Sequence, residues 1–139
     1  MTPQIECTVE RGLAAHGRQN RIRLFFVDDA LDYSGNASDI GKNVGDDLRE
    51  GKPTLPLIFL MEHGTTQQRE LVRACIENGD EKHFNDILEA ITSSGALDYT
   101  MNEAKKAAER AVQSISNLRH SEFKDSLLEL CAFAVNRNH

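Results

Sequence analysis

The chain has 139 residues, a net charge of −6 and a hydrophobic content of 40%, which describe an ordinary globular domain or a part of one. The acidic balance argues against binding to nucleic acid or to an anionic membrane surface. No apolar run is long enough to cross a bilayer, and no signal-peptide pattern is present. Three widely spaced cysteines without a CxxC pair predict reduced thiols in the cytoplasm rather than a zinc site, and the five histidines show no metal-ligand spacing.

The N-terminal segment, residues 1–25, is basic while the rest of the chain is acidic. The apolar run at residues 22–27 is compatible with a helix or a buried strand, because short runs do not separate the two by period. We favour a helix, since apolar and small residues fall roughly on one stripe: Leu13, Ala14, Gly17, Leu24, Val27 and Leu31. Arg21 and Arg23 interrupt this segment, and an arginine facing a packed interior is costly to bury without a partner.

Three carboxylates follow directly. On a helix, Asp28 and Asp32 share a face and Asp29 lies beside them. Like charges at this spacing repel each other, and hard oxygen ligands suit Mg²⁺, which commonly takes one or two carboxylates together with waters and substrate phosphates. The spacing by itself leaves metal binding and a solvated helix end equally open.

Residues 34–53 form the least regular region and contain four glycines. Lys42 and Lys52 lie in this region, and lysine acts on phosphate as a point charge. Alone, the two would be taken as solvated loop lysines. Next to three aspartates, they indicate a loop that holds an anionic ligand.

The rest of the chain predicts helices with short connections, which favour antiparallel neighbours. The apolar run at residues 55–61 is also compatible with a buried strand, but we favour a helix with Pro56 in its first turn and a stop at Gly64. Another helix is expected after a capping box at Thr65 and ends at Gly79. A third runs from residue 84 to a stop at Gly95. A second capping box at Thr100 predicts the start of a long helix whose alanine stripe is core packing, and residues 123–134 form the last helix.

Three segments, DDALDY at 28–33, GKNVGDDL at 41–48 and EGKPTLPL at 50–57, together resemble the second aspartate-rich region of the trans-polyprenyl diphosphate synthases. The closest likeness is to bacterial enzymes of the octaprenyl type, which make the quinone side chain. The resemblance covers about residues 12–139 and corresponds to the C-terminal part of such an enzyme. It implies an all-α fold, here part of the helical bundle of the isoprenoid synthases, usually as a homodimer.

The resemblance also implies a reaction, in which an allylic diphosphate is joined to isopentenyl diphosphate with Mg²⁺ as cofactor. Metal ions neutralise the charge that grows on the diphosphate as it leaves. By position, Asp28, Asp29 and Asp32 match the catalytic second motif, with Asp28 and Asp32 as metal ligands. Lys42 and Lys52 match the lysines that contact the diphosphate.

The chain departs from the family pattern in two respects. The 139 residues contain a single DDxxD, whereas the family's first motif and the residues that set product length lie far upstream. Residues 1–25 are atypical, with arginines where small residues are usual and Phe25 where a glutamine is usual. We therefore expect no synthase activity from these residues alone, and the product length stays open.

Two alternatives remain. A non-catalytic helical protein could use uncovered apolar helix faces for dimerisation or for pairing with an intact synthase. On the strand interpretation, residues 22–29 resemble the first strand and acidic pair of a receiver domain, although the rest of the chain lacks regular strand–helix alternation.

Overall fold

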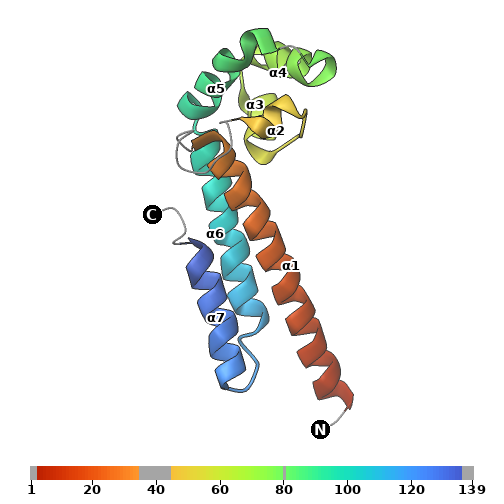
Figure 1. Cartoon of the computed structure of the whole chain (residues 1–139). Helices are drawn as coiled ribbons and strands as arrows, with labels where there is room; N and C mark the ends of the chain where they lie inside the picture. The colour runs from red at the N-terminus through yellow and green to blue at the C-terminus, as the bar shows by residue number, and fades with distance from the viewer. Residues whose placement is uncertain (1–2, 35–44, 80, 136–139) are drawn as a thin grey trace. The chain divides into compact units, whose positions relative to one another are not determined.

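The structure, a computed structural model, describes residues 3–34, 45–79 and 81–135, and every regular element in these ranges is a helix (Figure 1). The elements are α1 (Pro3–Ser34), α2 (Asp46–Arg49), α3 (Leu55–His63), α4 (Thr66–Asn78), the short 3₁₀ helix η1 (Glu81–His83), α5 (Phe84–Ser93), α6 (Ala96–Ser114) and α7 (Glu122–Val135). The all-α prediction is confirmed. The strand alternative is wrong, because α1 runs without a break through residues 22–29. None of the described helices combines the length and the apolar character needed to cross a membrane.

Several helix ends lie where local chemistry predicts them. Thr65 forms the expected capping box: its hydroxyl accepts the Gln68 N–H at 3.2 Å, and the Gln68 side chain accepts the Thr65 N–H at 3.0 Å. Gly79 ends α4 in the left-handed conformation with φ of 62°. Pro56 lies in the first turn of α3, where its missing N–H costs nothing.

One local prediction was wrong. The long helix α6 begins at Ala96 and not at Thr100, whose buried hydroxyl donates to the Ala96 carbonyl at 2.8 Å inside the helix. The earlier start follows from Gly95, which turns the chain with φ of 83°, and from the Ser94 hydroxyl, which accepts the Ala96 N–H at 3.3 Å. In the region expected to be irregular, residues 46–49 form the single helical turn α2.

The chain divides into two compact units, and α1 and α6 each contribute to both. The second unit, Phe26–Met101, has a core of large apolar side chains. Its fully buried members include Leu48 from α2, Leu57 and Leu60 from α3, and Ile91 from α5. This core fixes the elements that surround the acidic end of α1.

The first unit comprises Met1–Phe25 and Asn102–His139 and packs through small residues. The predicted alanine stripe of α6 is buried, as Ala104, Ala107 and Ala111 show. Gly12 of α1 lies so close to α6 that a Cβ there would come within 2.6 Å of the Ser114 carbonyl oxygen. The two helices therefore approach almost backbone to backbone in this unit.

The buried face of α1 in the first unit is polar, so the predicted apolar stripe was wrong here. Leu13 and Leu24 are exposed, whereas His16 and Arg23 are buried. His16 donates from Nδ1 to the Ala111 carbonyl at 3.0 Å, which leaves Nε2 to accept from Asn20 at 2.8 Å. These groups can face the interior because other helices supply partners that the spacing on α1 does not reveal.

Arg23 is the arginine whose burial was expected to be costly. Its guanidinium donates to the Cys131 carbonyl of α7, so the charge has a hydrogen-bond partner. Burial lowers the pKa of Arg23, and its Nε finds no acceptor within the described part of the chain. The site is therefore only partly satisfied, and we expect it to add little net stability to the fold.

Candidate functional site

Asp28, Asp29 and Asp32 lie in the last two turns of α1, on the portion of the helix that belongs to the second unit. Asp28 is exposed, and the other two are half-buried. The last turn of α1 carries no basic residue, so the carboxylates lie at the negative end of the helix dipole without compensation on their own helix. Without a bound cation this arrangement destabilises the end of α1, and it favours the binding of a cation there.

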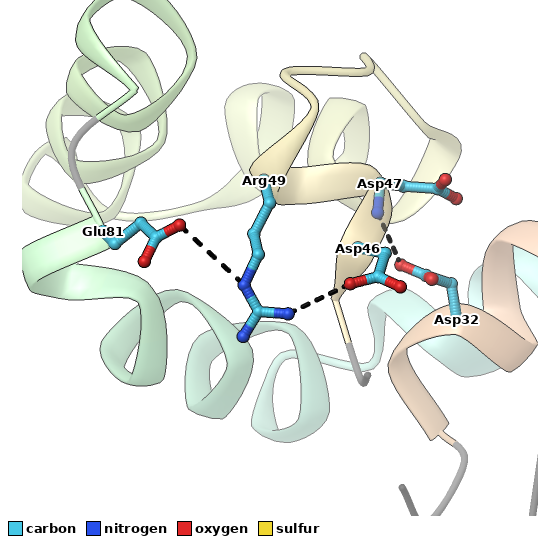
Figure 2. A network of polar contacts seen from close by, with 5 residues as sticks. All are labelled: Asp32, Asp46, Asp47, Arg49 and Glu81. Atoms are coloured by element: carbon cyan, nitrogen blue, oxygen red, sulfur yellow. Dashed lines mark hydrogen bonds and ion pairs between the residues drawn. The ribbon is translucent and has the colours of Figure 1, made fainter. Parts of the chain in front are cut away.

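Asp32 is tied to the turn that precedes α2. Its Oδ2 accepts the backbone N–H of Asp47 at 3.2 Å (Figure 2). Its carbonyl accepts the N–H of Gly45 at 3.0 Å. Gly45 has φ of 81°, which allows the chain to turn into α2 at this point. The carboxylate of Asp32 is therefore oriented by the backbone and not by its own helix alone.

Asp29 is oriented in the same way by the beginning of α3, because its Oδ2 accepts the N–H of Leu55 at 3.3 Å. Burial raises the pKa of Asp29 above its usual value, and the charges of Asp47 and Asp28 raise it further. The Leu55 N–H and Lys52 act in the opposite direction. A metal ion near Asp29 would relieve this penalty on its charged form.

Lys52 lies beside these carboxylates. Its Nζ is 2.9 Å from Glu50 Oε2 and 3.5 Å from Asp47 Oδ1, and its backbone N–H donates to the Asp47 carbonyl at 2.9 Å. The hydrogen bond to Glu50 and the charges of Glu50 and Asp47 raise the pKa of this exposed amine. Lys42, the second predicted phosphate-binding lysine, lies outside the described residues.

Tyr33 anchors the end of α1 directly after the acidic motif. Its buried hydroxyl lies 3.3 Å from the Thr54 hydroxyl, and either group can donate. Burial raises the pKa of Tyr33 far above its usual range, so the phenol stays neutral. The sequence alone did not single out this residue, although its place directly after DDxxD was visible.

Arg49 is the functional candidate that sequence reasoning missed entirely. Its guanidinium lies 3.0 Å from Asp46 Oδ1 and 4.0 Å from Glu81 Oε1 (Figure 2), and it stacks on the Phe84 ring at 4.5 Å. The last two contacts join α2 to η1 and to the start of α5. No local spacing could have predicted them, because α3 and α4 separate these partners in the sequence.

The carboxylates are suited to a cation that keeps most of its ligands from elsewhere. Within the described ranges, no three acidic, histidine or cysteine side chains converge closely enough to enclose a metal ion. One or two carboxylates, with water and phosphate oxygens in the remaining positions, make up the usual coordination of Mg²⁺. A cation bound by these carboxylates would take its remaining ligands from water or from a second bound molecule.

The chain is similar in sequence to known prenyl synthases. The pattern of the family described as Polyprenyl synthetase matches residues 20–93. Octaprenyl diphosphate synthase from Haemophilus influenzae is 46% identical over 131 residues, which are 94% of this chain and 40% of that protein. The enzyme of the same name from Escherichia coli is 39% identical over 130 residues, again 40% of its length. The chain thus spans about two fifths of these curated relatives.

Solved structures give the same relation. A polyprenyl synthase from Caulobacter crescentus, complexed with calcium and isoprenyl diphosphate, matches with a TM-score of 0.79 and 35% identity, covering 92% of this chain and 40% of that one. A decaprenyl diphosphate synthase from Rhodobacter capsulatus matches with a TM-score of 0.83 and 29% identity, covering 95% and 41%. Similarity in sequence and in backbone therefore extends over nearly all of these helices.

Proposed function

Because this chain belongs to the polyprenyl synthetase family, we propose that it supplies one wall of the Mg²⁺–diphosphate site of an octaprenyl-type prenyltransferase. In this proposal the 139 residues correspond to the C-terminal part of the enzyme. Asp28 and Asp32 hold Mg²⁺, Asp29 completes the acidic motif, and Lys52 and Lys42 contact the diphosphate. The substrates would be an allylic diphosphate and isopentenyl diphosphate, and the protein would act in the cytoplasm.

The observation that carries the proposal is the acidic end of α1 with its backbone supports. Two of the three carboxylates each accept one backbone N–H, from Asp47 and from Leu55, so their positions are set before any ligand arrives. The Nζ of Lys52 lies 3.5 Å from Oδ1 of Asp47, the residue whose backbone N–H orients Asp32. Preorganised charges of this kind stabilise a developing anion without reorganisation during the reaction.

The residues of the chain would hold the leaving group. Bound Mg²⁺ would neutralise the negative charge that accumulates on the diphosphate oxygens as the allylic carbon–oxygen bond breaks. Lys52 would bind a phosphate oxygen directly, exchanging its contact with Glu50 for one with the substrate. Asp29 and Asp32 would keep their orientation throughout, because the backbone amides that hold them do not take part in the chemistry.

Calorimetry tests the site directly. We expect Mg²⁺ and inorganic pyrophosphate together to bind the chain, and Asp28→Ala and Asp32→Ala each to weaken binding by at least about tenfold, or roughly 1.4 kcal/mol. Asp98→Ala, which removes an exposed carboxylate from α6 in the same unit, serves as the matched control. Unchanged binding in both motif variants would contradict the proposal.

Turnover tests the division of labour between the two motifs. Within these 139 residues the sequence contains one DDxxD. We therefore expect this polypeptide alone not to condense farnesyl diphosphate with isopentenyl diphosphate. Robust product formation would show that one aspartate-rich motif is enough.

A second candidate function is association through the first unit. Phe25 is 61% exposed, and a groove of about 710 Å³ between α6 and α7 is lined by Ala108, Val112, Leu128 and other residues. Apolar surface of this kind commonly marks an interface. If the chain is a homo-oligomer or an interaction module, light scattering will report a mass that rises with concentration, whereas a constant monomer mass speaks against it.

A further inference from the structure

The turn before α2 is held against the core from outside the acidic motif. Gly45 lies so close to Phe84 that a Cβ at this position would come within 2.4 Å of the tip of the ring. Phe84 belongs to the apolar core of the second unit and is 8% exposed. The backbone at Gly45 is thus in contact with the first residue of α5.

Arg49, at the other end of α2, also contacts Phe84. Its guanidinium stacks on the same ring at 4.5 Å, and its backbone N–H donates to the Gly45 carbonyl at 3.1 Å. Arginine binds an aromatic face through its planar guanidinium, a geometry that lysine reproduces less well. Both the beginning and the end of α2 are therefore in contact with Phe84.

The chain segment fixed in this way carries the amides that orient the site. Gly45 and Asp47 donate to the carbonyl and to the carboxylate of Asp32, and Asp47 also contacts Lys52. Rotation of α2 about its axis would break both hydrogen bonds to Asp32. Leu48 already anchors α2 in the core, so we expect Arg49 to limit the rotation of the turn rather than to be required for its formation.

Arg49 has a second effect, on charge. It forms an ion pair with Asp46, the neighbour of Asp47, at 3.0 Å. A carboxylate engaged by arginine is a weaker competitor for a cation. The pair therefore separates the two adjacent aspartates, so that Asp46 faces Arg49 while Asp47 supports Asp32 and Lys52.

We propose that Arg49, stacked on Phe84, is a positioning residue for the Mg²⁺–diphosphate site. It fixes the rotation of the turn at residues 45–47 and, through that turn, the orientation of Asp32 and Lys52. This inference rests on the proposed function of the site. It adds a residue outside the acidic motif on which tight diphosphate binding depends.

The test uses the whole chain and two measurements. The first is amide hydrogen exchange at Gly45 and Asp47 by NMR, which requires no ligand. The second is calorimetric binding of inorganic pyrophosphate with Mg²⁺. Arg49→Met removes the charge and keeps most of the side-chain length. Arg73→Met makes the same change at an exposed position on α4 of the same unit and is the matched control.

We expect Arg49→Met to accelerate exchange at both amides and to weaken binding about tenfold, the equivalent of about 1.4 kcal/mol, with an unchanged melting temperature. Arg49→Lys should recover part of both effects because it retains the charge. Arg73→Met should change neither. If Arg49→Met does not fold, Arg49→Lys and Phe84→Leu take its place, with the same direction expected.

The outcomes separate the two proposals. Unchanged exchange in Arg49→Met overturns the ordering role, whatever the binding result. Faster exchange with unchanged pyrophosphate affinity shows a purely structural contact and overturns the positioning role. Failure of the wild-type chain to bind pyrophosphate with Mg²⁺ overturns the function on which the inference rests, while the exchange measurement still decides whether Arg49 orders the turn.

Discussion

The two units of the chain use the same long helices to bury different kinds of surface. In the second unit, large aliphatic side chains such as Leu57 and Leu60 fill the interior. In the first, α1 buries His16 and Arg23 against an alanine-lined α6 and against α7. Apolar burial supplies stability, whereas buried polar groups supply orientation at little net gain. The unit that carries the acidic motif is the one with the apolar core, which can bear the cost of clustered like charges.

The difference between the apolar second unit and the polar first unit is tested most severely in the core of the second unit. Leu60→Ala should lower the free energy of unfolding by about 2–5 kcal/mol, because it removes a fully buried side chain and leaves a cavity. Urea denaturation measures the change. Ile58→Ala on the same helix, at a position 40% exposed, should cost only about 1 kcal/mol. Equal losses would mean that α3 is not packed as described.

Two glycines of α1 test the close packing of the first unit. Gly12→Ala should lower the free energy of unfolding by about 1–3 kcal/mol, because the new Cβ meets the backbone oxygen of Ser114 at 2.6 Å. At Gly17 a Cβ would meet no atom within 4 Å. Gly17→Ala should therefore raise the free energy of unfolding by about 0.5–1 kcal/mol, because alanine has the higher helix propensity. Thermal denaturation of the two variants under the same conditions gives the sign. A stabilising Gly12→Ala would refute the close approach.

The buried arginine tests whether polar contacts in the first unit orient more than they stabilise. Arg23→Met should leave the free energy of unfolding within about 1 kcal/mol of the wild type, because a partly satisfied buried charge is replaced by an apolar side chain of similar length. Urea denaturation is again the measurement. A loss of about 3 kcal/mol or more would show that the Arg23–Cys131 contact stabilises the unit directly.

The smallest expected effect concerns Asp29 in the second unit. Burial raises the pKa of this carboxyl in the folded protein, so its charged form opposes folding at neutral pH. Without metal, Asp29→Asn should therefore raise the free energy of unfolding by roughly a few tenths of a kcal/mol, as solvent screens a half-exposed group. The difference should shrink as the pH falls through the folded pKa and should vanish below the usual value, where Asp29 is protonated in both states. Thermal scans between pH 7 and about 4 follow it.

The fold was predictable where local chemistry decides it. The capping box at Thr65, the stop at Gly79 and the alanine stripe of α6 all lie where the sequence indicates, since each depends on neighbours within one or two turns. The polar face of α1 was not predictable, because the acceptors that allow His16 and Arg23 to be buried lie on α6 and α7 and leave no signal in the spacing along α1. Thr100 was misread for a related reason: a hydroxyl that bonds back within a helix has the same sequence signature as a cap.

The candidate site was likewise predictable only in part. The acidic motif and Lys52 were visible in the sequence, because their spacing along the chain is short. Their supports were not visible: the amides of Asp47 and Leu55 carry no side-chain signature, and Arg49 acts through Phe84 of α5. Contacts between distant segments depend on the packed core, and a single sequence does not contain that core in readable form.

The stacking of Arg49 on Phe84 has a further use as an internal magnetic reporter. Protons above an aromatic ring are shielded by its ring current, so the Nε–H and Cδ protons of Arg49 should resonate upfield of other arginines. The turn that orients Asp32 thus carries its own spectroscopic label. Following these resonances during a titration would report movement of the turn in the unmodified protein, without any probe attached to the acidic residues themselves.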